Sequence, residues 1–207
     1  MTIALPPSAG PASGNHLSDR SLFALAVLNF FLADARDGLG PFLDAYLATN
    51  GWSSMALGAI ATAGGLIGLL ATPLFGALVD RSRWKRALIA GPVVFVTLTA
   101  LLTLLSPSLA IVWFGQMGTA VVGAVIGPAL AGLTLGLVGE KLFPRQIARN
   151  EFWNHGGNFA SLFAVFLVIP IFGNSGMIWL MIATALGTLA AIAAIEPRRI
   201  DHDVARG

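Results

Sequence analysis

The sequence predicts an all-α membrane protein with six transmembrane helices and both termini in the cytoplasm. Of its 207 residues, 56% are hydrophobic and only 11% are charged, whereas soluble domains carry about 25% charged residues. The mean hydropathy is +0.80. Apolar segments of the roughly 20 residues that a spanning helix needs recur along the chain, and nearly all basic residues lie in alternate turns between them. The positive-inside rule makes that side cytoplasmic.

A short basic segment, residues 81–86, fixes this topology. It carries four of the chain's twelve Lys and Arg residues and separates two long apolar segments. A segment this charged cannot lie in hydrocarbon, so it marks a cytoplasmic boundary. Counting crossings away from it places further basic residues on the same side: Arg20, Lys141, Arg145, Arg149, Arg198, Arg199 and Arg206. The twelfth, Arg36, lies inside a predicted helix. So strong a bias argues against dual topology.

The predicted helices follow one another closely within a bundle that covers residues 19–197. Their expected ranges are 21–48, 53–79, 87–105, 109–138, 150–172 and 176–195. Residues 1–18 are rich in Pro, Ser, Gly and Ala and are expected to form a disordered cytoplasmic tail, and residues 198–207 a second cytoplasmic tail. We expect Gly38, Gly40 and Pro41 to loosen or kink the first helix.

Small residues recur four apart on the second and fourth predicted helices. The two stripes are Gly64, Gly68, Thr72 and Gly76, and then Gly115, Thr119, Gly123 and Gly127. Small side chains let helix backbones approach closely within a membrane. We interpret both stripes as packing surfaces.

The segment that ends the second helix resembles the signature loop of the major facilitator superfamily. That loop reads Gly-x-Leu-x-Asp-Arg-x-Gly-Arg-Lys/Arg. The matching residues in this sequence are Gly76, Leu78, Asp80, Arg81 and Lys85. Arg83 and Trp84 stand where the family has Gly and Arg. Residues 36–42 and 145–158 also resemble family members, so the resemblance covers nearly the whole chain.

The resemblance implies a secondary transporter that moves a small solute by alternating access, coupled to protons, in an inner membrane of bacterial type. Such transporters contain two six-helix halves with the substrate site between them. This chain resembles the N-terminal half only, so a second half must come from elsewhere. We expect a parallel homodimer. The predicted orientation permits it, because both copies would have their termini in the cytoplasm. The alternatives are a heteromer with a different half, and an accessory, regulatory or truncated subunit that does not transport.

Three charged residues inside the first helix, Asp34, Arg36 and Asp37, are the sharpest functional signal. Ionisable groups at this depth cost several kcal/mol and usually face a cavity or a partner. Asp34 and Asp37 share a helix face, which Pro41 and Asp44 continue. A carboxylate beside another carboxylate can load and release a proton, so we expect a proton and substrate pathway here. The alternatives are an Asp–Arg pair that locks helices together, or an early helix end in outer water.

The fifth helix offers a second polar face, with Asn150, Asn154 and Asn158 spaced by four and His155 beside them. Such a face lines a pathway or bonds to a neighbouring helix. Because histidine titrates near neutral pH, His155 is a candidate proton carrier, although a lone histidine is more often a hydrogen-bonding partner.

Two single amides, Asn29 and Gln116, are further pathway candidates, and each is as readily a packing hydrogen bond. Gln116 lies near the place where many proton-coupled family members carry an arginine, which is absent here. The resemblance also implies a cytoplasmic gate of Gly76, Asp80, Arg81 and Lys85. Asp80 would bond near the start of the fifth helix of the opposite half. The alternative is simple packing of the loop.

Enzyme, metal and nucleic-acid classes are not expected. The chain has no cysteine, and His16 and His202 lie in the predicted tails, so no ligand cluster forms. No nucleophile–base pair and no cofactor motif is visible in the sequence. The expected partners are a small solute, protons, the lipid bilayer and a second six-helix half.

Overall fold

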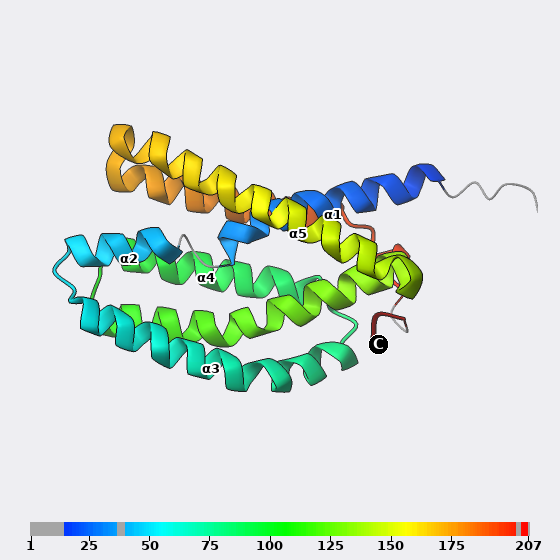
Figure 1. Cartoon of the computed structure of the whole chain (residues 1–207), viewed down its shortest axis with the longest axis horizontal. Coiled ribbons are helices and arrows are strands. Elements are labelled where there is room, and N and C mark those ends of the chain that lie inside the picture. Colours follow the sequence, from blue (N-terminus) through cyan, green and yellow to red (C-terminus); the bar gives the residue numbers. More distant parts are fainter. Residues whose placement is uncertain (1–14, 37–39, 202–203, 207) are drawn as a thin grey trace, which may run out of the picture.

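The computed structural model describes residues 15–36, 40–201 and 204–206, and this part of the chain is built from helices. Figure 1 shows long helices running side by side, with turns at the two ends of the bundle. In chain order the elements are α1 (Asn15–Ala35), α2 (Gly40–Thr49), α3 (Ser54–Arg81), α4 (Ala87–Leu105), α5 (Leu109–Ala194) and the 3-10 turns η1 (Pro197–Arg199) and η2 (Val204–Arg206).

Helix α5 is folded back on itself rather than straight. Its backbone is non-helical at Gly139 and Gly173, where φ is +71° and +54°, a conformation open mainly to glycine. Figure 1 shows the chain reversing there, which divides α5 into a first arm (109–138), a second arm (140–172) and a third arm (174–194). Residues 140–149, which lie between two of the expected helices, are therefore helical, and the second reversal lies at Gly173.

The first predicted helix, 21–48, is divided into α1 and α2. Arg36 forms a turn in which its backbone N–H donates to Leu32 O at 3.0 Å, and α2 begins at Gly40. The expected kink is therefore a complete break, in keeping with the flexibility of glycine and with proline's preference for the first turn of a helix. Helix α1 begins at Asn15, so residues 15–18 of the expected tail are helical, while residues 1–14 lie outside the described part.

The outer surface of the bundle is apolar. Helices α3, α4 and α5 are long and apolar enough to cross a membrane. On α3, Leu66, Leu69, Leu70 and Leu74 are 58–74% exposed. A contiguous face of this kind is unfavourable in water and suits a lipid environment.

Helix α1 is held against the second and third arms of α5 by two glycines. At Gly157 the second arm approaches the carbonyl oxygen of Phe30 so closely that no side chain could fit between them. At Gly187 of the third arm, a Cβ would lie 2.7 Å from the ring of Phe31. Below this contact, residues such as Leu28 and Ile126 form the main core with α4 and the first arm.

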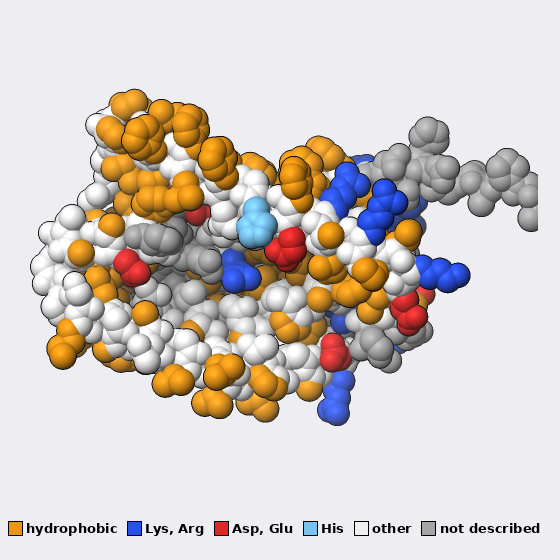
Figure 2. Space-filling view, viewed as in Figure 1, with side chains coloured by type: hydrophobic (Ala, Val, Ile, Leu, Met, Phe, Trp, Pro, Cys, Tyr) orange, Lys and Arg blue, Asp and Glu red, His pale blue; other side chains and the backbone are white. Residues whose placement is uncertain are grey.

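One end of the bundle, the basic end, contains the basic loop after α3, the Gly139 turn and the C-terminal segment. Arg86 Nη2 donates to Ala193 O at 3.3 Å, and the Asp201 N–H donates to Gly136 O at 2.9 Å. Figure 2 shows Lys and Arg side chains gathered at this end of the visible face. The orientation of this end toward the cytoplasm remains a prediction from the positive-inside rule.

The C-terminal segment, residues 196–206, packs against the bundle where it is described. Ile200 and Ala205 are 7% and 2% exposed. Room for them exists because residue 136 is glycine: a Cβ there would lie 2.9 Å from Ala205 Cβ and from Asp201 O. The described part of the expected 198–207 tail is therefore docked; residues 202–203 and 207 lie outside it.

Candidate solute pathway

Three polar side chains, Asp44, Gln116 and Thr119, line a cavity of about 260 Å³ between α2, α3 and the first arm of α5. The remaining lining is small or apolar, including Gly64 and Gly65. Asp44 reaches the cavity because the break after α1 lets α2 run as a separate helix.

Arg36 lines a second cavity, of about 370 Å³, which the two small-residue stripes shape. Thr119 and Ala120 line both cavities, so the two adjoin. Asp44, Gln116, Thr119 and Arg36 therefore lie along one track, hereafter the polar track. A carboxylate, an amide, a hydroxyl and a guanidinium could there bind a small solute with hydrogen-bonding groups.

The small-residue stripes, expected to be packing surfaces, also border a cavity. Gly64 and Gly68 do pack, since a Cβ at either would lie 3.7 Å from an atom of Ala120. At Gly123 and Gly127 a Cβ would meet nothing within 4 Å, and these two residues line the cavity of Arg36. Their missing side chains create space along the track.

The charged residues predicted in the first helix differ in burial where the structure describes them. Asp34 is buried at 9% exposure, whereas Arg36 is exposed to its cavity. Asp37 lies outside the described residues. Asn29 is 2% exposed, and its Nδ2 donates to Leu25 O of the same helix at 2.7 Å, which is the geometry of a packing hydrogen bond.

The second predicted polar face is split by burial. Asn150 is buried, Asn154 is half-buried, and His155 and Asn158 are exposed. Neither cavity of the polar track is lined by any of them.

Asn150 belongs to a buried amide network, which fits the alternative that this face bonds to a neighbouring helix; its partners Gln146 and Thr134 were not expected from the sequence. Gln146 Nε2 donates to Asn150 Oδ1 at 2.9 Å, and Asn150 Nδ2 donates to Thr134 Oγ1 at 3.0 Å. Thr134 Oγ1 in turn donates to Leu130 O at 2.8 Å. The network joins the first and second arms across the Gly139 turn. The spacing of Gln146 and Asn150 by four was the available signal.

Comparison with known proteins decides the family of this bundle. A sequence profile described as the MFS_1 like family matches residues 22–196. The chain belongs to the major facilitator superfamily. It is therefore an integral membrane protein from a family of transporters rather than of enzymes.

Two curated members of the superfamily are similar to this chain. Both are described as uncharacterized MFS-type transporters of Mycobacterium tuberculosis, one from strain CDC 1551 / Oshkosh and one from strain ATCC 25618 / H37Rv. Each is 40% identical over 185 residues, which cover 89% of this chain and 44% of the relative. The chain thus spans less than half the length of these relatives. No solved structure matches.

The facilitator loop motif lies at the basic end. Asp80 and Arg81 are exposed and Gly76 is half-buried. Lys85 is 1% exposed, and its Nζ donates to Val79 O at 3.2 Å. Gly132 makes room for it, because a Cβ there would lie 2.8 Å from Nζ. Lys85 therefore stabilises the loop from inside the bundle.

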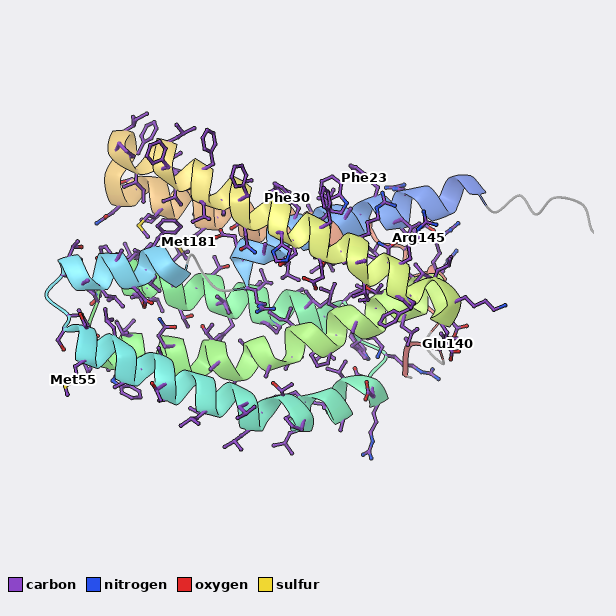
Figure 3. The ribbon with its side chains drawn as sticks, in the orientation of Figure 1. Phe23, Phe30, Met55, Glu140, Arg145 and Met181 are labelled. Carbon is purple, nitrogen blue, oxygen red and sulfur yellow. The ribbon has the colours of Figure 1, made fainter. Side chains whose placement is uncertain are left out.

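The ends of the bundle differ in chemistry, as Figure 3 shows. Glu140 and Arg145 project at the basic end, while Met55 marks the opposite end. The polar track lies between α2, α3 and the first arm, away from the surface where Phe23 of α1 is 67% exposed.

Proposed function

We propose that the chain forms one six-helix half of a secondary transporter that moves a small solute by alternating access. The observation that carries the proposal is the polar track. Polar and charged groups inside an apolar bundle are costly and are retained where they face a cavity or a pathway. The cavities, of about 260 and 370 Å³, together fall within the range of about 300–1,000 Å³ typical of small-molecule sites.

The transport is coupled to protons in this proposal, and the membrane is an inner membrane of bacterial type. Carboxylates at Asp34, Asp37 and Asp44 follow one another along α1, the break and α2. A carboxylate exchanges a proton when its surroundings change between closed and water-filled. Alternating access between the two halves would change those surroundings.

In this proposal a second copy of the chain supplies the other half of the transporter. The family architecture that the chain resembles brings two six-helix halves together around an axis normal to the membrane. In a parallel dimer, exposed Asp80 and Arg81 of one copy would face the second arm of the other and close the cytoplasmic side. Asn154, His155 and Asn158 of that arm would contribute to the pathway between the halves.

A flux experiment tests this proposal. The purified chain is reconstituted into liposomes that contain a pH-sensitive dye, and a panel of small solutes is added under an imposed pH gradient. At least one solute should accelerate proton movement, and Asp37→Asn and Asp44→Asn should reduce that rate to the level of empty liposomes. The control is Glu140→Gln, an exposed residue at the basic end. Unchanged flux in folded variants would count against proton coupling.

A further inference from the structure

A groove of about 390 Å³, here called the loop groove, lies at the basic end and apart from the polar track. It runs between the start of α4 and the end of the third arm of α5. Arg83, Trp84 and Arg86 form its rim, and its floor is apolar, including Ala90, Ile192 and Ile200. Neither the transport proposal nor the family assignment gives these residues a role.

The rim residues include both departures from the family's loop pattern. Arg83 and Trp84 stand where the superfamily loop has Gly and Arg, so the gate motif does not account for them. Trp84 is 75% exposed. Indole side chains are enriched at membrane interfaces, where an apolar ring meets a polar surface. The loop groove therefore combines features of a boundary between lipid and water.

The electrostatics of the loop groove favour an anion. The guanidinium of Arg83 is exposed, and Arg86 is anchored by the bond from its Nη2 to Ala193 O. Arg86 Nε is buried and has no hydrogen-bond partner among the described residues. The carboxylate of Glu196, next to the groove-lining Pro197, accepts from Arg199 Nε at 3.1 Å. Among the described residues neither Arg83 nor Arg86 has a carboxylate partner, so the positive charges of both remain available to an anion.

We propose that the loop groove binds an anionic phospholipid. The headgroup phosphate would accept hydrogen bonds from Arg83 and Arg86, which are favoured by the charges on both partners. An acyl chain would lie on the apolar floor and continue along α4. Basic pockets between helices on the cytoplasmic side of a membrane are suited to anionic headgroups. Inorganic phosphate would leave the apolar floor uncovered, so the lipid is the better match.

Native mass spectrometry of the whole chain, purified in a neutral detergent, tests the proposal. Phosphatidylglycerol and phosphatidylcholine of equal chain length are added in turn, and bound lipid is counted. We expect wild-type protein to retain phosphatidylglycerol preferentially. The double variant Arg83→Gln, Arg86→Gln should bind it about tenfold or more weakly.

A matched control separates the loop groove from general surface charge. The variant Arg145→Gln, Arg149→Gln removes the same charge from exposed positions of the second arm outside the groove and should bind as wild type. A second variant, Ala90→Phe, fills the floor and keeps both arginines, so it tests the groove even if loss of the Arg86 bond disturbs folding. It should also lose the lipid.

Three results would overturn the proposal. Equal loss of lipid in the Arg145→Gln, Arg149→Gln control would show binding to surface charge alone. Equal retention of phosphatidylcholine would remove the headgroup preference. Displacement of phosphatidylglycerol by soluble glycerol phosphate at the same concentration would show a site for soluble phosphate rather than for lipid. None of these measurements depends on solute flux, so they stand apart from the transport proposal.

Discussion

At the scale of single residues, burial decides which polar side chains hold the fold and which remain available to a ligand. Asn150 and Asn158 lie on one face by spacing, yet Asn150 is 2% exposed and fully engaged with Gln146 and Thr134, while Asn158 is exposed. Hydrogen bonds between membrane helices each contribute modestly, up to about 1.7 kcal/mol. One such bond, from Asn150 Nδ2 to Thr134 Oγ1, meets at Asn150 a second bond that comes from Gln146 within the same arm.

We predict that Asn150→Ala lowers the free energy of unfolding by about 1–2 kcal/mol, because it leaves Gln146 and Thr134 without their partner. Thermal unfolding in detergent measures the effect. Asn158→Ala is the control and should change stability by less than about 0.5 kcal/mol, as exposed substitutions usually do. An equal effect of both changes would contradict the assignment.

Gly157 is the residue at which packing leaves no room for a side chain. We predict that Gly157→Ala destabilises the bundle by about 1–3 kcal/mol or more, because the new methyl group overlaps the backbone of Phe30. Gly91→Ala on α4 is the control, since a Cβ there meets nothing within 4 Å. It should leave stability unchanged or raise it, as alanine is the better helix former.

At the scale of elements, the breaks and reversals between helices decide which residues line the polar track. The break between α1 and α2 brings Asp44 to one cavity and Arg36 to its neighbour. The reversals at Gly139 and Gly173 fold α5 so that its first arm lines the track while the other two hold α1. The C-terminal segment then docks on the first arm at Gly136.

We predict that Gly136→Ala displaces the C-terminal segment, because its Cβ would lie 2.9 Å from both Asp201 O and Ala205 Cβ. The chain has no cysteine, so Ile200→Cys gives a single reporter that is smaller than the native side chain. A water-soluble maleimide should label it slowly in the parent and faster with Gly136→Ala. Labelling that does not change would show that the segment tolerates the methyl group; Gly91→Ala serves again as the control.

At the scale of the whole molecule, the bundle has lipid-compatible surfaces, a basic end and a polar track between α2, α3 and the first arm of α5. A transporter built from two such halves requires a second bundle beside this one. The exposed motif residues Asp80 and Arg81 lie at the end where the two halves would close.

We predict that the chain, extracted in lipid nanodiscs, has a protein mass of twice 21.5 kDa, because one bundle supplies only one wall of a central pathway. Native mass spectrometry gives the stoichiometry. Crosslinking between cysteines at position 80 and near position 150 would test the parallel arrangement. A pure monomer in the native membrane would favour an accessory role instead.

The sequence by itself determined the class of the protein and the approximate placement of its helices. Hydropathy and length mark apolar segments because a backbone in lipid must satisfy its own hydrogen bonds within helices. The loop from Gly76 to Lys85 gave the superfamily, which the match over residues 22–196 confirms. The sequence predicted an interruption of the first helix at Gly38, Gly40 and Pro41. It could do so because glycine and proline affect the backbone conformation locally, without contacts to other helices.

Only the tertiary structure decided which of the candidate residues line the same cavity and which are buried in packing. Contacts between distant parts of the chain bury Lys85 and Asn150. Such contacts also place Arg36 and Thr119 in the wall of one cavity and hold the C-terminal segment against the bundle. Periodicity assigns a residue to a helix face, but the neighbouring helix decides whether that face is packed or hollow. At Gly123 and Gly127 the same small residues that suggested close packing instead leave open space.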